Sequence, residues 1–479
     1  MNYRMIRYLL GVILLIEAVF MTLSSVVSLI YEESVFPFLI TVAILLCISL
    51  PFVIFKPKNT QIFAKEGFVT VASGWILLSV FGALPFIFSG SITNYVDALF
   101  ETVSGLTTTG ATLIQNIEIL PKGILFWRSL THWIGGMGVL VFMLAILPSA
   151  DGQTMHLMRA EVPGPTKGKL VPKMRQSSLI LYGIYVALTI IEIAVLLAVG
   201  LPLYDSIVNS LGTAGTGGFS VLNNSIAGYN NPAVEWVIAV FMLLFGVNFN
   251  IYFFVLMGKA RDALKSEELR IYLAIVAFAT VAISIDTATM FNSTGETIRT
   301  AFFQVTSIIS TSGFSTVDFN LWPGFSKMII LLLMITGACA GSTAGGLKLS
   351  RVIIIFKSAL KEIRHMRRPK SINVVRLDGE AVPNETVKSA AGYVIVYIVI
   401  FMISTLLISI DGFSLETNFS TILTTLNNVG PGFDAVGPTG NFSIFSDFST
   451  LVLSFTMLIG RLEIMPMMIL FSSVFSRRK

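Results

Sequence analysis

Four short glycine-containing segments, each lying between two apolar runs, constrain the fold of this chain more than any other feature. We name them loop 1 (106–112, LTTTGAT), loop 2 (214–220, AGTGGFS), loop 3 (310–315, STSGFS) and loop 4 (427–432, NNVGPG). Thirteen positions before each central glycine stands a residue of a type that often caps helices. The glycines are Gly110, Gly218, Gly313 and Gly430, and the residues before them are Asp97, Asp205, Thr300 and Thr417. The chain therefore carries a fourfold repeat.

Each repeat is expected to form a short capped helix that leads into its loop. The seventh position before the glycine is apolar or threonine, and the sixth is small or hydroxylic. These positions hold Val103, Leu211, Thr306 and Leu423, and Ser104, Gly212, Ser307 and Thr424, respectively. Such a helix has about three turns, roughly 15 Å, which is half of the hydrocarbon thickness of a bilayer. It cannot cross a membrane alone, so its loop is expected at membrane depth.

A loop at that depth must be buried in protein or face water, because lipid offers its polar groups no partner. Four such loops therefore belong around one aqueous axis, with the partially negative carboxyl ends of four helices directed at it. A ring of backbone carbonyls can replace the hydration shell of a monovalent cation, and glycine permits the torsions that turn carbonyls inward. The sequence predicts a pseudo-fourfold cation pore in one chain.

We assign ion contact to the backbone carbonyls of each central glycine and of the two residues before it. Loop 4 departs furthest from the others, and Pro431 removes a backbone donor there. Ordinary turns between spans are the alternative for any one loop, but the shared register disfavours that alternative for the set. The assigned residues are Thr108, Thr109, Gly110, Thr216, Gly217, Gly218, Thr311, Ser312, Gly313, Asn428, Val429 and Gly430.

Composition places the chain among polytopic membrane proteins. Of its 479 residues, 54% are hydrophobic and 12% are charged, values that lie outside the usage of soluble globular proteins. The net charge of +5 does not indicate nucleic-acid binding, because the basic residues gather in the loops of one membrane face. Cys47 and Cys339 lie far apart in apolar surroundings, so neither a disulfide nor a metal site is expected. The histidines have no metal-binding spacing, and no function is assigned to His132, His156 and His365.

The apolar runs predict ten spans with both termini in the cytoplasm. An N-terminal hairpin (9–30 and 36–55) has no glycine loop and lies outside the repeat. The outgoing helices are expected at 68–88, 179–201, 271–291 and 387–410, and the returning helices at 127–147, 234–257, 327–337 and 451–475. This topology puts 27 of the 32 Lys and Arg residues on the cytoplasmic face, which favours the orientation. The predicted units are 1–66 for the hairpin, then the repeats 67–175, 176–265, 266–370 and 371–479.

The third returning helix is expected to break in a run of small residues, GACAGSTAGG. Each glycine destabilises a helix by about 1 kcal/mol relative to alanine, so this glycine-rich segment (337–346) is predicted to be irregular and to face the cavity below the loops. A close-packed helix crossing is the alternative. The segment comprises Gly337, Ala338, Cys339, Ala340, Gly341, Ser342, Thr343, Ala344, Gly345 and Gly346.

Arg461 lies inside an apolar span, where an arginine usually faces a partner or a water-filled cavity. We favour a position near the pore, where its charge raises the barrier to cations in the closed state. The alternatives are a salt bridge to Glu463 or a side chain that reaches the membrane surface. Asp97, Glu101 and Asp205 are expected to be caps or outer charges that concentrate cations, rather than direct ion ligands.

At these residues the chain resembles the Trk/Ktr/HKT superfamily of potassium transport proteins, and within it the TrkH type. The resemblance covers nearly the whole sequence. Beyond the four loops it includes FETVSGLTTTGAT, FWRSLTHWIGGMGVLVF, KLVPK, GACAGSTAGGLK and GRLEIMP.

This resemblance implies a gated potassium uptake pore in a bacterial inner membrane, with potassium as the favoured ion and rubidium able to pass. It implies that the glycine-rich segment and Arg461 form the gate. In plant HKT relatives, a serine in place of the loop 1 glycine accompanies sodium preference, whereas this chain has glycine at all four places. The resemblance also implies a homodimer and a cytosolic TrkA-type nucleotide-binding regulator. The basic stretches 348–370 and 159–175 offer a surface for that regulator.

Three other functions are alternatives to a channel-like pore. A sodium- or proton-coupled symporter needs an ionisable mid-membrane residue, and the sequence offers only Arg461, which does not titrate. An intramembrane enzyme needs a nucleophile with a base or a metal motif, and the sequence shows neither. A non-transporting sensor stays open, although it has no need of four matched loops. The chain has no P-loop or Rossmann fingerprint, so it is not expected to bind a nucleotide itself.

Overall fold

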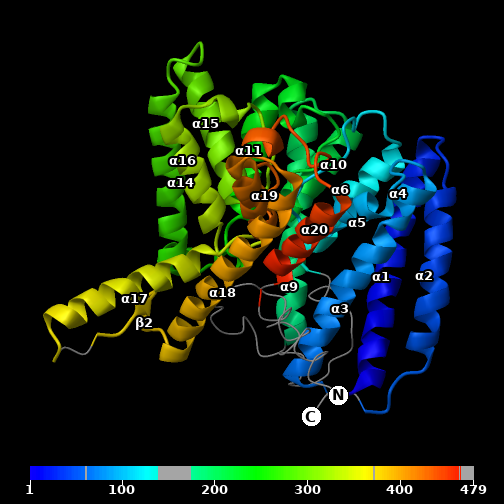
Figure 1. Cartoon of the computed structure of the whole chain (residues 1–479), viewed down its shortest axis with the longest axis horizontal. Helices are drawn as coiled ribbons and strands as arrows, with labels where there is room; N and C mark the ends of the chain where they lie inside the picture. Colours follow the sequence, from blue (N-terminus) through cyan, green and yellow to red (C-terminus); the bar gives the residue numbers. More distant parts are fainter. Residues whose placement is uncertain (60–61, 139–173, 371–372, 463, 465–479) are drawn as a thin grey trace.

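Long apolar helices dominate the structure (Figure 1). The computed structural model describes residues 1–59, 62–138, 174–370, 373–462 and 464. Within that part, six helical stretches are long and apolar enough to cross a membrane, and a bent helix pair would make a seventh. The six are α1 (Tyr3–Ile30), α2 (Phe36–Ile54), α3 (Ala64–Gly82) with α4 (Leu84–Phe88), α9 (Met174–Ala198), α14 (Glu267–Asp286) and α18 (Asn384–Ile408). The prediction of a mainly helical protein with several membrane spans is therefore confirmed.

Four shorter helices each end directly before one of the loops. They are α5 (Tyr95–Leu106), α10 (Leu203–Gly215), α15 (Thr294–Ile309) and α19 (Leu415–Asn427). Their lengths of 12, 13, 16 and 13 residues correspond to about 18–24 Å at 1.5 Å per residue. All four lie within one part of the helix bundle, in the upper half of Figure 1.

These four helices begin earlier than predicted. Side chains of Asn94, Ser293 and Ser414 cap α5, α15 and α19, and α10 begins after Pro202. The expectation that Asp97, Asp205, Thr300 and Thr417 are the caps was therefore wrong. Three of them stand at the third helical position, where an aspartate still interacts favourably with the helix dipole, and Thr300 lies further inside its helix.

The returning helices are α6 (Lys122–Gly136), the pair α11 (Pro232–Phe245) and α12 (Phe249–Leu256), α16 (Gly324–Thr336) and α20 (Asp447–Leu462). The predicted continuous helix over 234–257 was wrong, because α11 and α12 are bent by 91°. Gly246 ends α11, and the Asn248 side chain caps α12 by accepting a hydrogen bond from the Asn250 amide. The continuous first returning helix predicted at 127–147 was also wrong, because α6 ends at Gly136. The end predicted for the last returning helix lies outside the described residues.

At the end of the molecule where α1 begins, α17 (Leu349–Arg367) projects from the bundle (Figure 1). Next to it in sequence is an antiparallel hairpin of β1 (Arg376–Leu377) and β2 (Glu380–Ala381), in which Arg376 pairs with Ala381. An ion pair of 2.5 Å between Lys357 and Glu267 ties α17 to the start of α14. The short elements α13 (Ala260–Leu264), η1 (Ser225–Tyr229), η2 (Phe319–Leu321), η3 (Ser409–Asp411) and η4 (Asp434–Val436) complete the described chain.

The N-terminal hairpin packs against the first repeat. Helix α1 contacts α2, α3 and α6, and it approaches α2 closely at Gly11. A Cβ atom at Gly11 would lie 2.8 Å from the Cβ of Phe52, so a larger residue there would push the two helices apart. Met21 of α1 and Leu45 of α2 are fully buried members of the same hydrophobic core.

Candidate functional site

The four loops meet in a closed ring, which we call the glycine ring. Each central glycine lies against the backbone carbonyl of the residue that precedes the next glycine. A Cβ atom on any of the four would lie 2.7 Å or less from that carbonyl oxygen, which is inside van der Waals contact. The successive pairs are Gly110 with Gly217, Gly218 with Ser312, Gly313 with Val429, and Gly430 with Thr109. Because the fourth contact returns to loop 1, the loops stand around the axis in sequence order.

All four loops share one backbone conformation. The glycines have φ values of 78°, 78°, 79° and 97°, and the residues two positions earlier have 56°, 57°, 58° and 55°. Those earlier residues are Thr108, Thr216, Thr311 and Asn428. A β-branched residue is rarely left-handed, so three threonines in this conformation mark a strained backbone that the surrounding structure imposes. Loop 4 keeps the pattern despite its different sequence, with the largest deviation at Gly430.

The ring has the electrostatic character of a cation site. The four short helices end at the ring, so their partially negative carboxyl ends converge there. A cavity of about 90 Å³ adjoins it, and all four central glycines contribute to its lining. Among the described residues that line this cavity there is no carboxylate, so backbone carbonyls and helix ends supply the negative potential. The arrangement suits a monovalent cation that has lost part of its water.

Arg128 is the charged residue in the lining of this cavity, and its partner is Glu101. Both side chains are buried, and 2.5 Å separates the Arg128 Nε from a Glu101 carboxylate oxygen. The guanidinium also lies 3.4 Å from the centre of the Phe219 ring in loop 2. Glu101 in turn accepts hydrogen bonds from the Thr112 hydroxyl at 3.0 Å and the Leu113 amide at 3.1 Å.

The prediction that Glu101 is a cap or an outer charge that concentrates cations was therefore wrong, because Glu101 lies inside α5 and its buried carboxylate pairs with Arg128. Asp97 and Asp205 are half-buried in the first turns of their helices. Sequence reasoning missed Arg128, although an arginine within the apolar stretch FWRSLTHW is itself a signal that a buried partner exists.

The glycine-rich segment lies directly below loops 3 and 4. Helix α16 ends at Thr336, and the residues up to Lys348 are non-helical and mostly buried, so the alternative of a helix crossing was wrong. The Gly345 amide donates a 2.7 Å hydrogen bond to the hydroxyl of Thr311 in loop 3. A Cβ atom at Gly345 would collide with the carbonyl oxygen of Asn427 in loop 4. The segment therefore touches the ring residues themselves.

The break between α11 and α12 receives the glycine-rich segment. The Cys339 amide donates to the Gly246 carbonyl at 3.1 Å, and the Phe249 amide donates to the Gly341 carbonyl at 3.0 Å. The open helix ends at the 91° bend thus find their partners in the segment. The contacts with the glycine-rich segment explain a helix break that the local sequence alone does not predict.

Glu268 in α14 joins the glycine-rich segment to the start of α17. One of its carboxylate oxygens accepts hydrogen bonds from the Ala340 amide at 2.7 Å and from the Ser350 amide at 3.1 Å. Ser350 lies in the first turn of α17, so the carboxylate also satisfies a free amide at that helix end. Sequence reasoning missed Glu268, which stands beside several other charged residues at a helix start.

Arg461 is buried and donates to backbone carbonyls on two elements. Its Nη1 lies 2.7 Å from the carbonyl oxygen of Thr343 in the glycine-rich segment. Its Nη2 lies 2.5 Å and 2.7 Å from the carbonyl oxygens of Gly135 and Gly136 at the end of α6. The side chain therefore bridges the segment and α6 rather than reaching the membrane surface. Glu463 lies outside the described residues.

The remaining candidates do not form a metal centre. Within the described part of the chain, no group of three or more His, Cys, Asp or Glu side chains could hold a metal ion, and Cys47 and Cys339 are unpaired thiols. His132 is buried, with its Nδ1 2.7 Å from the Gly105 carbonyl and its ring against Phe219. His365 is exposed on α17, and His156 lies outside the described residues.

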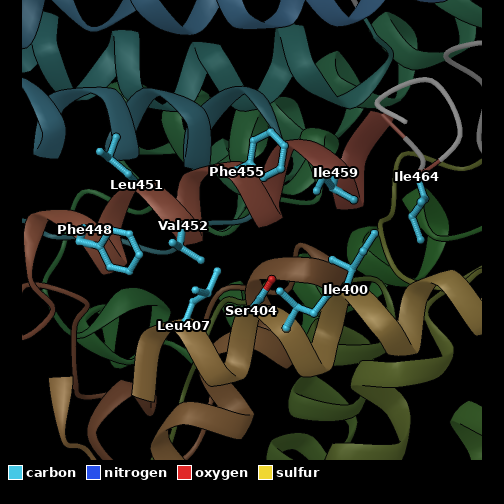
Figure 2. A pocket seen from close by; sticks show the side chains of 10 residues that line it. Ile400, Ser404, Leu407, Phe448, Leu451, Val452, Phe455, Ile459 and Ile464 are labelled. Carbon is cyan, nitrogen blue, oxygen red and sulfur yellow. The ribbon is translucent and has the colours of Figure 1, made fainter. Parts of the chain in front are cut away.

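A second cavity, of about 440 Å³, lies between α18 and α20 (Figure 2). Figure 2 shows Phe448, Leu451 and Phe455 of α20 on one side and Leu407 of α18 on the other. Among the described residues that line it, Ser404 is the one polar residue. One hydroxyl group cannot replace the hydration shell of an ion, so this cavity is not a candidate ion site.

Comparison with known proteins gives consistent results over the whole chain. A family model described as the cation transport protein TrkH matches residues 35–478. The Trk system potassium uptake proteins TrkH of Salmonella typhimurium and of Escherichia coli K12 are each 34% identical to this chain over 100% of both sequences. The crystal structure of the potassium transporter TrkH from Vibrio parahaemolyticus superposes with a TM-score of 0.89 at 30% identity, covering 100% of both chains. The chain belongs to the TrkH family of cation transport proteins.

Proposed function

We propose that this chain takes up potassium ions across the bacterial inner membrane through a gated, channel-like pore, and that the glycine ring is its selectivity filter. The observation that carries the proposal is the closed cycle of four glycine-to-carbonyl contacts. The names of the relatives support potassium as the transported ion. The filter comprises the three residues assigned in each loop, twelve in all.

The chemistry of the filter follows from the ring. Carbonyls of four equivalent loops surround one axis, and they replace the water molecules that a potassium ion sheds on entry. Rubidium passes too, because it carries the same charge and sheds its water as readily. The four helix ends stabilise the dehydrated cation without a fixed carboxylate, so the ion is held weakly enough to leave. The electrochemical gradient drives the flow.

The gate in this proposal consists of the glycine-rich segment, residues 337–346, with Arg461. The segment lies under loops 3 and 4, where it obstructs the path of an ion that leaves the filter. Its hydrogen bonds to Thr311, Glu268 and Arg461 favour the closed arrangement. Opening requires these bonds to break together.

The proposed topology has ten spans, with both termini in the cytoplasm. The spans are the hairpin of α1 and α2 and, for each repeat, one outgoing and one returning helix, in the units 1–66, 67–175, 176–265, 266–370 and 371–479. The excess of basic residues on the face that carries α17 supports this orientation.

The proposed partner is a cytosolic TrkA-type regulator that binds the nucleotide, since this chain has no nucleotide-binding motif of its own. The basic helix α17 projects from the bundle and offers a docking surface at the proposed cytoplasmic face (Figure 1). Of the other basic stretch, 159–175, residues 159–173 lie outside the described residues. A homodimer is part of the proposal. Coupled symport and enzymatic activity are not favoured, because the relatives are named as potassium uptake proteins.

Ion flux into liposomes that contain the purified chain tests the proposal. The expected result is uptake of rubidium that greatly exceeds uptake of sodium and lithium. Empty liposomes provide the control for leakage. Equal uptake of all three ions would contradict a potassium filter. Rubidium uptake that depends strictly on a sodium or proton gradient would favour the symporter instead.

A further inference from the structure

In repeats 1, 2 and 3, the position six residues before the central glycine faces the backbone just after that glycine. In repeats 1 and 3 it holds Ser104 and Ser307, which are fully buried. The Ser104 hydroxyl donates a 2.6 Å hydrogen bond to the carbonyl of Ala111, and the Ser307 hydroxyl donates a 2.6 Å hydrogen bond to the carbonyl of Phe314. Ala111 and Phe314 immediately follow Gly110 and Gly313. The two bonds are therefore equivalent, and both tie the carbonyl beyond the glycine to the short helix behind the loop.

A second pair of hydroxyl contacts repeats in the same two loops. The Thr107 and Thr109 hydroxyl oxygens lie 2.8 Å apart in loop 1, and the Ser310 and Ser312 oxygens lie 2.8 Å apart in loop 3. At the matching positions, loop 2 has two glycines, and loop 4 has asparagine and valine. Loops 1 and 3 are thus braced alike by hydroxyl groups.

Repeats 2 and 4 use different residues at the sixth position. In repeat 2 it is Gly212, where a Cβ atom would lie 3.0 Å from the carbonyl oxygen of Phe219. Gly212 therefore lies beside the carbonyl after the central glycine, as Ser104 and Ser307 do, but it has no hydroxyl to donate a hydrogen bond to it. In repeat 4 it is Thr424, whose hydroxyl donates instead to Thr421 within its own helix. The bond found in repeats 1 and 3 therefore has no counterpart at this position in repeats 2 and 4.

The order of the ring places loops 1 and 3 opposite each other, because the glycine contacts run from loop 1 to 2, from 2 to 3, from 3 to 4 and from 4 back to 1. The fourfold ring therefore contains a twofold pattern, with two braced loops facing each other across the axis. A ring that can contract would also solvate a smaller ion such as sodium. Hydrogen bonds that hold two opposite loops from behind resist this contraction along one diagonal.

We propose that Ser104 and Ser307 are positioning residues that set the preference of the filter for potassium over sodium, without touching the ion. This inference rests on the proposed function. It predicts that loss of either hydroxyl lowers discrimination rather than conduction, because the carbonyls remain while their fixed spacing is lost.

The test measures rubidium and sodium flux side by side in liposomes and uses their ratio, which does not depend on how much protein is active. Ser104→Ala and Ser307→Ala are each expected to lower the rubidium-to-sodium ratio about fivefold, the effect of one hydrogen bond, and the double variant is expected to lower it further. Ser210→Ala is the matched control, since Ser210 is a buried serine of α10 whose hydroxyl has no hydrogen-bond partner among the described residues. Its ratio is expected to equal that of the wild type.

The outcomes separate the two proposals. A wild type that discriminates, with alanine variants that discriminate equally well, would overturn the role of the two serines and leave the filter intact. A wild type that does not discriminate would overturn both. A ratio lowered equally by Ser210→Ala would also overturn the inference, because the effect would then come from packing in general.

Discussion

The amide of Gly345 and the hydroxyl of Thr311 join the glycine-rich segment to the glycine ring through a hydrogen bond of 2.7 Å. Thr311 is one of the four left-handed residues of the ring, so a single side chain links the proposed filter and the proposed gate. Movement of the segment away from the pore axis must break this bond. The position of the glycine-rich segment and the shape of loop 3 are therefore coupled.

Thr311→Val is expected to raise rubidium flux in the absence of a regulator about fivefold, because it removes one bond that favours the closed segment. Thr108→Val is the matched control. Thr108 occupies the same place in loop 1, and its buried hydroxyl has no hydrogen-bond partner among the described residues. Each variant replaces a left-handed threonine of the ring by valine, so the effect of that change on the ring is common to both. The difference between their fluxes therefore measures the hydrogen bond between Thr311 and Gly345. Equal fluxes would show that the bond does not hold the segment.

Glu268→Ala is expected to raise the same basal flux more than tenfold, because the Ala340 and Ser350 amides both lose a charged acceptor. Glu268→Gln keeps one oxygen acceptor and is expected to give an intermediate flux. The adjacent Glu267 pairs with Lys357 on α17 at a partly exposed site, so Glu267→Ala should change basal flux little. If Glu267→Ala opened the pore as much as Glu268→Ala, the start of α14 as a whole would be responsible, and not the carboxylate that holds the segment.

The fourfold repeat was visible in the sequence because its cause is local. A central glycine is required wherever a Cβ atom would strike the neighbouring loop, and this requirement recurs at Gly110, Gly218, Gly313 and Gly430. The small or hydroxylic residues six positions earlier were visible for a similar reason. Ser104 and Ser307 bond to the backbone seven residues further along the same repeat.

Features that depend on distant partners were not visible. The bend between α11 and α12 depends on residues about ninety positions away in the glycine-rich segment. A single glycine in an apolar run is not enough to predict such a bend. Glu101 and Arg128 lie on two helices that loop 1 separates in the sequence. The sequence around either residue therefore does not identify the other as its partner. The helix starts were misplaced by a few residues because several capping types stand close together before each short helix.

Removal of one member of the buried pair of Glu101 and Arg128 is expected to lower the free energy of unfolding more than removal of both members. Glu101→Gln or Arg128→Met alone leaves a buried charge unpaired, at a cost of about 3–5 kcal/mol in the free energy of unfolding. The double variant is expected to recover much of that loss. Thermal unfolding of the four proteins in detergent measures the coupling. Additive losses in the double variant would contradict a direct pairing.

The pair of Arg299 and Glu235 provides the comparison. Its two atoms lie 2.7 Å apart, and its side chains keep 21% and 11% of their surface exposed, against 2% and 0% for Arg128 and Glu101. Removal of one member there is expected to cost about 1 kcal/mol or less.

Asp434 lies in the segment after loop 4, and its hydrogen bonds predict that the stability of the protein falls in acid. Hydrogen bonds from the hydroxyls of Thr417 and Ser414 lower the pKa of this carboxyl group below its ordinary value. A group with a lowered pKa in the folded state contributes stability above its ordinary pKa, and that contribution is lost as the pH falls towards the folded-state pKa. Between about pH 4 and pH 3, the melting temperature of the wild type should therefore fall more steeply than that of Asp434→Asn. Parallel curves would show that these hydrogen bonds do not favour the ionised carboxylate.

The central claim is that four glycines in one cycle of contacts form the filter. The most direct measurement is the ratio of rubidium to sodium flux in liposomes for the wild type and for alanine at each of the four positions in turn. Every one of the four variants should lower the ratio, because each added Cβ displaces the carbonyl of the next loop. Gly183→Ala in α9 is the control, since a Cβ there meets no atom within 4 Å. A ratio that stays at the wild-type value in all four variants would contradict the account.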